Sequence, residues 1–193
     1  MRTHLTGKLS LVAKLAVIAL VLAAVPAWGK SKEAKQNEVK KKSQETLAKL
    51  YKVLPSAQKT VGGAAGYAVF SNFGMKLGLA GGGSGKGMAV DNQTKKTTYM
   101  KMVELQAGLG LGVKKFSVVW VFEKQDALNK FVDSGWELGG QSSAAAKTGD
   151  KGGSLAGAMS VSPGVWLYQL VDKGLALELT AKGTKYFKDG DLN

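Results

Sequence analysis

The spacing of apolar residues changes at Pro55. Before this proline, apolar and small residues recur at intervals of three or four, which is the spacing of one face of an α-helix. The stripe consists of Val39, Ser43, Leu47, Leu50, Tyr51 and Leu54, and the opposite arc carries Lys41, Lys42, Lys49 and Lys52. We therefore predict an amphipathic helix that ends at Pro55, because proline has no N–H to continue the helical hydrogen bonds.

Such a helix has two interpretations. Its leucine stripe can pack on the chain's own domain while the lysines stay in solvent. Alternatively, the helix can lie on a membrane, and both descriptions hold together if only the lysine face meets lipid. We expect the packed helix, which is the commoner arrangement.

Beyond Pro55 the pattern consists of short apolar runs separated by glycines and polar residues. These runs predict strands at Tyr67–Phe70, Met75–Ala80, Lys86–Val90, Thr97–Val103, Leu105–Val113, Ser117–Phe122, Met159–Ser162, Val165–Val171 and Leu175–Thr180. The gaps leave little room for the long crossovers of parallel sheets, so the pairing should be mostly antiparallel. Polar turns are expected at Asp91–Thr94 and at 172–174.

One helical pattern interrupts the strands, from Gln125 to Val132, and the small polar residues from Gln141 to Gly157 predict a loop. The expected fold class is therefore α+β. It consists of a mostly antiparallel, glycine-rich β-sheet of sandwich or barrel type, with an N-terminal amphipathic helix and one short internal helix.

The first 29 residues follow the pattern of an export signal. Three basic residues precede an uncharged run at 15–29. This run is shorter than the roughly 20 apolar residues that cross a bilayer, and it ends in small residues. Cleavage after Ala27 and cleavage after Gly29 both fit, and an uncleaved membrane anchor is the alternative. We expect an exported protein, periplasmic or associated with the cell envelope.

Export changes what the basic charge implies. From Lys30 onward the chain has 24 basic and 14 acidic residues, a net charge of about +10, and nine of the lysines lie between Lys30 and Lys59. Outside the cytoplasm, a basic protein first meets anionic lipid head groups or acidic envelope polymers. We expect no nucleic-acid partner, because export argues against it and no RNP-like aromatic signature is present.

The absence of cysteine and the position of the one histidine limit the chemistry. The chain has no cysteine, and His4 lies in the signal. Disulfides, zinc sites of the usual N/S type, serine–histidine triads and cysteine nucleophiles are therefore excluded after export. The closest acid pairs are Glu123 with Asp126 and Asp189 with Asp191. The first should lie at a helix N-terminus and the second in a polar tail, so we predict no enzymatic activity and no cofactor.

The stretch GLAGGGSGKG at 78–87 has the composition of a phosphate-binding loop but not its spacing. A Walker loop needs a glycine, four residues and then Gly-Lys-Ser/Thr, whereas Ala80 and Gly87 occupy the first-glycine and hydroxyl positions here. Residues 108–113 alternate glycine with Leu or Val, the period of a strand and not of a dinucleotide fingerprint. We interpret the glycines at 81–85 as turn or bulge residues, with an anion held by bare amides as the alternative. Those at 108–112 give a strand one smooth face that permits close approach of another backbone.

Several motifs occur together in one order along the chain. They are AGYAVF at 65–70, KLG at 76–78, GGSGKG at 82–87, the glycine-alternating strand, VVWVF at 118–122 followed by DAL at 126–128 and Phe131, GWELG at 135–139, and KGL at 173–175. This combination, from about Leu47 to Lys188, resembles the SYLF lipid-binding domain family. The resemblance implies binding of phosphoinositides and other acidic phospholipids through basic residues and an N-terminal amphipathic segment. It also implies work on membranes and actin in eukaryotic relatives, and export in bacterial ones.

Two segments depart from the family pattern. Many members have a Trp-Ser-x-Pro-like segment where this chain has TYMKM at 98–102, and a Gly-Pro turn where it has AAAKTG at 144–149. A head-group preference is therefore not carried over. Actin is not an expected partner for an exported chain.

From these observations we predict an exported peripheral membrane protein that binds anionic phospholipids through a basic surface. The expected organisation is a signal at 1–29, a basic segment at 30–45, the lipid-binding domain at 46–188 and a polar tail at 189–193. The first candidate binding residues are Lys40, Lys41, Lys42, Lys49 and Lys52, and the second are Lys76, Lys86, Lys114 and Lys115. The alternative is a non-catalytic cell-envelope module that docks another protein or an anionic polymer through its glycine-rich face.

Overall fold

The computed structural model describes residues 29–138, 155–172, 174–176 and 183–193, and within them the side chains of 72–80 and 105–114 are not described. The predicted signal and most of the predicted loop at 141–157 therefore lie outside the described residues. Residues Lys32–Asn193 form one compact unit. None of the described helices is long and apolar enough to span a membrane.

The described elements are three helices and seven strands. The helices are α2 (Lys32–Val53), α3 (Ser56–Gly63) and α4 (Gln125–Ser134). The strands are β1 (Gly66–Asp91), β2 (Thr97–Phe122), β3 (Trp136–Leu138), β4 (Met159–Ser162), β5 (Val165–Val171), β6 (Gly174–Ala176) and β7 (Thr184–Lys188).

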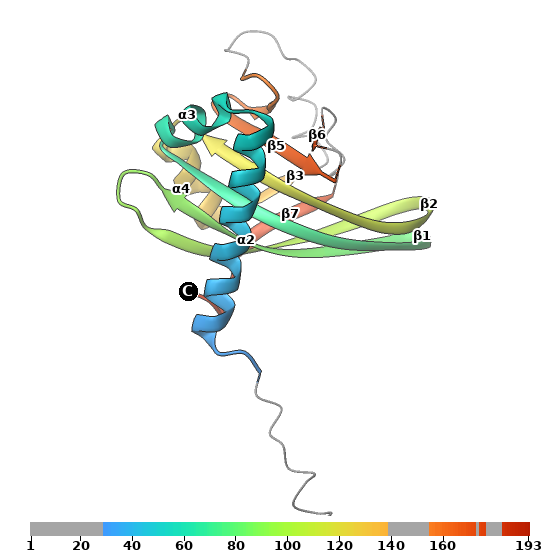
Figure 1. Cartoon of the computed structure of the whole chain (residues 1–193). Helices are drawn as coiled ribbons and strands as arrows, with labels where there is room; N and C mark the ends of the chain where they lie inside the picture. Colours follow the sequence, from blue (N-terminus) through green and yellow to red (C-terminus); the bar gives the residue numbers. More distant parts are fainter. Residues whose placement is uncertain (1–28, 139–154, 173, 177–182) are drawn as a thin grey trace, which may run out of the picture. The chain divides into compact units, whose positions relative to one another are not determined.

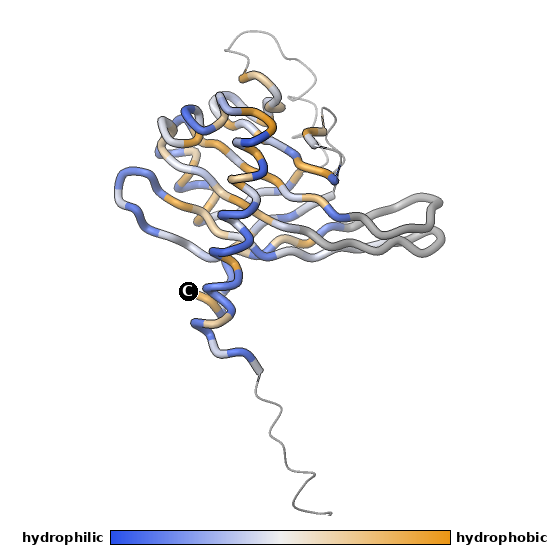
Figure 2. Tube along the Cα trace, viewed as in Figure 1, coloured by the Kyte–Doolittle hydropathy of each residue, from blue (hydrophilic) through white to orange (hydrophobic). Residues whose placement is uncertain are grey.

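Helix α2 packs on the sheet, as the apolar stripe predicts. Val39, Ser43, Thr46 and Leu50 are buried, and the rest of the helix is mostly hydrophilic (Figure 2). The helix begins at Lys32, before the stripe, and ends at Val53, just ahead of Pro55. Its first turns contain few apolar residues, so apolar spacing could not reveal them.

The strands form one antiparallel sheet, which confirms the α+β class. Strand order is β3-β7-β2-β5-β4, with β1 paired to β2 and β6 to β5 (Figure 1). Strand β2 is central because its first half pairs with β7, at Met100–Glu104, and its second half pairs with β5, at Ser117–Phe122. The hairpin connection expected at 172–174 joins β5 to β6, where Val171 pairs with Gly174.

Six of the predicted strands merge into two. Strands β1 and β2 each have 26 residues and pair along their whole length. The prediction placed one break in the glycine run at 81–85, because glycine weakens the tendency to form a strand, and others at 71–74, at Glu104 and at 114–116. The backbone ladder continues through all four. The polar turn follows Asp91, whose Oδ1 accepts hydrogen bonds from the backbone N–H groups of Gln93 and Thr94.

The long β1–β2 ribbon doubles back on itself. A Cβ atom on Gly87 would overlap the carbonyl of Val69, and one on Gly85 would overlap the carbonyl of Ser71. These contacts centre the fold-back on Gly78, where the ladder between β1 and β2 also shifts register. Gly85 and Gly87 therefore permit close backbone approach within β1, and the turn or bulge predicted at 81–85 is wrong because these residues continue the strand. The strand at 108–112, for which close approach was predicted, lies outside the described side chains.

Three short elements were not predicted: α3, β3 and β7. Helix α3 buries only Ala57 and Val61 and ends in two glycines, which is a weak helical signal. Strands β3 and β7 are three and five residues long, and each is held by its pairing with a sequence-distant strand. Local sequence carries little information about such pairing.

Two apolar clusters lie on opposite faces of the curled sheet. One gathers aromatic side chains under α4, including Phe70, Trp120, Phe131 and Tyr186, and the rings of Phe70 and Tyr186 are 4.8 Å apart. The other lies under α2 and α3, around Leu50. Alternating residues of β2 supply both clusters, because successive side chains of a strand point to opposite faces.

Candidate functional site

A groove of about 740 Å³ runs beside helix α2, between the helix and the β1–β2 ribbon. Six lysines line it: Lys35, Lys42 and Lys49 from α2, Lys86 from β1, and Lys101 and Lys115 from β2. Glu38 and Asp172 are the acidic residues that line it, so the lining has a formal excess of four positive charges. We call this feature the cationic groove.

Helix geometry places three of these lysines on one flank of α2. Lys35, Lys42 and Lys49 are spaced by seven residues, which is close to two helical turns. They therefore follow the edge of the buried stripe and face the groove. Lys42 also pairs with Glu38 one turn earlier, with an N–O distance of 3.0 Å, and Lys49 donates a hydrogen bond to the Val171 carbonyl at 3.2 Å.

Strand register determines which side chains form the other wall of the groove. Lys86 on β1 lies opposite Lys101 on β2, and Lys101 lies opposite Phe187 on β7. Side chains opposite each other in an antiparallel pair share a face of the sheet. Two lysines and one aromatic ring therefore form a single row across three strands.

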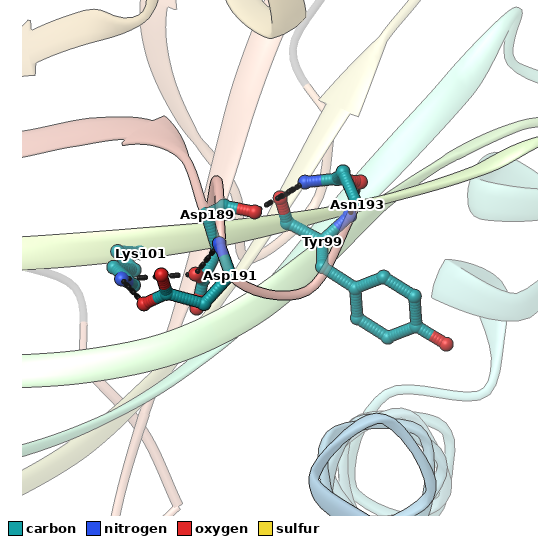
Figure 3. Close-up of polar contacts among 5 residues, drawn as sticks. All are labelled: Tyr99, Lys101, Asp189, Asp191 and Asn193. Carbon is teal, nitrogen blue, oxygen red and sulfur yellow. Dashed lines mark hydrogen bonds and ion pairs between the residues drawn. The ribbon is translucent and has the colours of Figure 1, made fainter. Parts of the chain in front are cut away.

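Two aspartates compensate Lys101. Its Nζ is 2.9 Å from Asp189 Oδ1 and 2.8 Å from Asp191 Oδ2 (Figure 3). The two carboxylates differ in environment, since the Asp189 side chain is fully buried and that of Asp191 is 82% exposed. Residues 189–193, predicted as a polar tail, thus bring one buried and one exposed carboxylate to Lys101, which lines the groove.

Neighbouring lysines lower the pKa of Asp191. The hydrogen bond from Lys101 lowers the pKa of the Asp191 carboxyl, and the nearby charges of Lys35 and Lys86 lower it further. The same two carboxylates raise the pKa of Lys101. Lysines from α2, β1 and β2 therefore all favour the charged form of a single exposed carboxylate.

The turn that carries these aspartates is held firmly to β2. The Asn193 side chain accepts a hydrogen bond from the Tyr99 N–H at 2.9 Å and donates one to the Tyr99 carbonyl at 2.7 Å (Figure 3). Leu192 is buried with Val39 of α2 and Tyr99. Gln36 of α2 donates a hydrogen bond to the Leu192 carbonyl at 2.7 Å.

Uncharged side chains complete the lining of the groove. Ser71 and Ser117, neighbours across β1 and β2, share a hydrogen bond of 3.4 Å. Val103 and Phe187 also line the groove, although they are 39% and 37% exposed. The groove therefore combines a cationic rim with an exposed apolar strip.

The structure brings four of the predicted lysines together. Lys42, Lys49, Lys86 and Lys115 line the cationic groove, although they come from the two separate sets of the sequence prediction. Three others, Lys40, Lys41 and Lys52, are exposed on α2 but do not line it. The side chains of Lys76 and Lys114 lie outside the described ones.

Sequence reasoning missed Lys35 and Lys101. The seven-residue spacing of Lys35 with Lys42 and Lys49 is a signal that could have found the first. No sequence signal marks Lys101, because its place depends on its register with β1 and on the C-terminal turn.

The carboxylates of the two acid pairs noted in the sequence have structural roles. Glu123 accepts a hydrogen bond from the Trp166 indole N–H at 2.7 Å, and Asp126 lies in the first turn of α4, where its charge suits the helix dipole. Asp189 and Asp191 bind Lys101. Each pair thus has a structural role in the described part of the chain.

Comparison with known proteins gives two matches. Residues 103–193 match the model of the Ysc84 family, described as Las17-binding protein actin regulator. The chain carries a domain of the Ysc84/SYLF family. The chain is also similar to Beta cell expansion factor A from Aeromonas veronii, with 34% identity over 148 residues. These residues cover 76% of the present chain and 54% of the Aeromonas protein. The present chain therefore spans about half the length of this relative.

Membership of the SYLF family supports a lipid-binding, membrane-associated domain at the level of the family. The family is a non-catalytic lipid-binding or adaptor family. Actin regulation is part of the description of the matched family model.

Proposed function

We propose that this SYLF protein is an exported peripheral membrane protein that binds anionic phospholipids at the cationic groove. The observation that supports this most directly is the convergence of lysines from α2, β1 and β2 on one groove. Scattered surface lysines serve solubility, whereas lysines gathered by three separate elements form a local positive field.

The expected affinity follows from membrane electrostatics. Each lysine close to an anionic bilayer contributes on the order of 1 kcal/mol, and the effect falls off within a Debye length of about 10 Å at moderate salt. Six lysines line the groove, and four acidic groups lie on or beside it, namely Glu38, Asp172, Asp189 and Asp191. The remaining excess of two charges contributes on the order of 2 kcal/mol, so binding should be weak and salt-sensitive and should need a high fraction of acidic lipid.

Export is the second part of this proposal. The signal pattern at 1–29 and the basic composition favour a periplasmic or envelope location, where anionic lipids and acidic polymers are the available partners. Neither actin nor nucleic acid would be met there.

The alternative envelope module was expected to dock through a smooth glycine face. In the structure, Gly85 and Gly87 of β1 already face the backbone of residues 69–71 of the same strand. The glycine face of that alternative consists of Gly108, Gly110 and Gly112, which lie outside the described side chains, so docking through it stays a prediction.

Vesicle sedimentation with two matched triple variants tests the proposal. The groove variant is Lys42→Gln, Lys49→Gln and Lys86→Gln, and the control with equal charge loss is Lys40→Gln, Lys41→Gln and Lys52→Gln. We expect the parent protein to bind acidic vesicles, to ignore neutral ones and to be released by salt. The groove variant should lose about 100-fold in affinity, from about 1 kcal/mol for each lysine, and the control less than tenfold.

Two results would contradict this assignment. Equal losses for both triple variants would remove the groove from the mechanism and leave only general charge. Indifference to acidic vesicles at low ionic strength would overturn the lipid-binding proposal itself.

A further inference from the structure

Exposed apolar side chains lie next to the cations of the groove. Among the described side chains, three large hydrophobic ones are exposed, Val53, Val103 and Phe187, and the last two line the cationic groove. Phe187 lies opposite Lys101 across β7 and β2, and Val103 is two residues further along β2, on the same face. Adsorption on an anionic bilayer through lysine charge alone does not require this apolar strip.

The other end of this strip already holds an anionic group. The Asp191 carboxylate is 2.8 Å from Lys101 Nζ, and Lys35 and Lys86 lie near enough to act on its charge. Within the described part of the chain, neither Lys35 nor Lys86 has an ion-pair partner closer than 4 Å. All three lysines line the cationic groove, so a small oxyanion bound beside Lys101 is favourable there.

The geometry points to a binding site for one anionic amphiphile per chain. Its oxyanion head group lies among Lys35, Lys86 and Lys101, at the place of the Asp191 carboxylate, and its hydrocarbon chain lies over Val103 and Phe187. This inference rests on the proposed lipid-binding function, and it replaces adsorption on a surface by capture of a single molecule in a groove.

The occupant follows from complementarity. A bare anion satisfies the lysines but leaves the apolar strip in water, and an uncharged lipid covers the strip but leaves the lysines without a counter-charge. A molecule with one oxyanion and one alkyl chain satisfies both. The groove volume of about 740 Å³ lies within the usual range of ligand sites, roughly 300–1,000 Å³.

Asp191 can leave this position without disrupting the fold. Its side chain is 82% exposed, so turning it into solvent uncovers little. Asp189 remains buried beside Lys101 and keeps that lysine in place. The exposed carboxylate therefore acts as an internal stand-in for the head group.

Calorimetric titration with dodecyl phosphate, below its micellar concentration, tests the inference on the full chain. We expect saturable binding of one molecule per chain. Inorganic phosphate, which lacks the alkyl chain, should bind at least 100-fold more weakly, and so should dodecyl maltoside, which lacks the charge. Inorganic phosphate binding as tightly as dodecyl phosphate would overturn the hydrocarbon site, and equal binding of the maltoside would overturn the head-group site.

Matched variants locate the ligand. Val103→Ser combined with Phe187→Ser should weaken dodecyl phosphate at least tenfold and leave inorganic phosphate unchanged, while Val53→Ser, an equally exposed site outside the groove, changes neither. Lys86→Gln should weaken both phosphate ligands. Unchanged dodecyl phosphate binding in the double serine variant would overturn the placement of the chain.

Comparison with vesicles separates the two proposals. Binding of acidic vesicles without saturable binding of dodecyl phosphate would overturn the groove site and leave surface adsorption standing. Stoichiometric binding of dodecyl phosphate by a protein that ignores acidic vesicles would sustain the groove site and overturn the membrane proposal.

Discussion

Lys86 and Lys101 lie directly opposite each other in the antiparallel pair of β1 and β2, although both carry a positive charge. Like charges in this position destabilise a sheet unless something compensates them. The compensation comes from the C-terminal turn, where Asp189 and Asp191 bind Lys101. The same turn therefore stabilises the sheet and reduces the positive charge of the groove.

Removing the exposed carboxylate of this turn should strengthen binding. We expect Asp191→Asn to raise the affinity for acidic vesicles about fivefold, since one negative charge near the bound lipid is worth on the order of 1 kcal/mol. Asp133→Asn is the control, because Asp133 is also exposed and paired, with Lys188 at 2.8 Å, and neither residue lines the groove. Equal effects of the two variants would show that only net charge matters.

The carboxyl of Asp191 should titrate below its usual pKa of 3.8, because Lys101 and then the nearby Lys35 and Lys86 favour its charged form. Because the pKa of Asp191 is lower in the folded than in the unfolded state, its ion pair with Lys101 stabilises the protein above the unfolded-state pKa. This stabilisation is lost as pH falls through the folded-state pKa. Lys101 has a raised pKa, so its contribution is fully present below 10.5 and is lost as pH rises through the folded value. The pair therefore persists throughout the neutral range.

Carbon-detected NMR titration with two variants checks this assignment. Lys86→Gln should raise the pKa of Asp191 toward its usual value and leave Asp133 unchanged. Lys188→Met should raise the pKa of Asp133, which Lys188 lowers, and leave Asp191 unchanged. A pKa of Asp191 that does not respond to Lys86→Gln would place Lys86 too far from the head-group position.

A methyl group at Gly87 should destabilise the fold. Its Cβ would overlap the Val69 carbonyl and the Phe70 ring, and neither can move without opening the fold-back of β1. We expect Gly87→Ala to lower the free energy of unfolding by about 1–3 kcal/mol in urea denaturation. Gly82→Ala is the control, because the nearest atom to its Cβ is the Glu104 carbonyl oxygen at an ordinary 3.5 Å. Equal stability of the two variants would contradict the close approach.

The C-terminal turn should contribute to stability despite its polar sequence. Leu192 is 1% exposed and packs with Val39, Met88 and Tyr99. Leu192→Ala should therefore cost about 2–4 kcal/mol of unfolding free energy. Val53→Ala, at a side chain that is 45% exposed, should change it by less than about 0.5 kcal/mol. A loss at Leu192 no larger than that at Val53 would mean that the turn is detached in solution.

Export predicts a processed N-terminus. Protein recovered from an extracytoplasmic fraction should begin at Trp28 after cleavage behind Ala27, or at Lys30 after cleavage behind Gly29. N-terminal sequencing distinguishes these, and an intact Met1 on all recovered protein would leave the export signal without support.

The sequence was informative wherever local pattern and final environment agree. The stripe from Val39 to Leu54 predicted a packed helix, and the apolar runs predicted the strands that became β4 and β5, with their residues in the observed bounds. It was misleading at the glycines, where propensity suggested breaks but β1 continues. It gave little for β3 and β7, whose few residues are strands only because they pair with each other and with β2.

In the candidate site, too, some residues could be predicted from local sequence and others could not. Seven-residue spacing on α2 already aligns Lys35, Lys42 and Lys49 on one side of the buried stripe, because helical periodicity is a local property. The partners of these lysines are not local. Lys86 and Lys101 reach them only through strand register, and Asp191 only because residues 189–193 are bound to Tyr99.

The sequence by itself therefore determined the fold class, the packed basic helix, the excess of positive charge and the resemblance to the SYLF family. Composition and short-range periodicity express these properties directly. Tertiary structure alone decided which lysines share a groove, which carboxylates neutralise them and where apolar side chains remain exposed. Those relationships depend on pairing between residues far apart in the chain. They also depend on the fold-back of β1, which Gly85 and Gly87 permit but which their presence in the sequence does not predict.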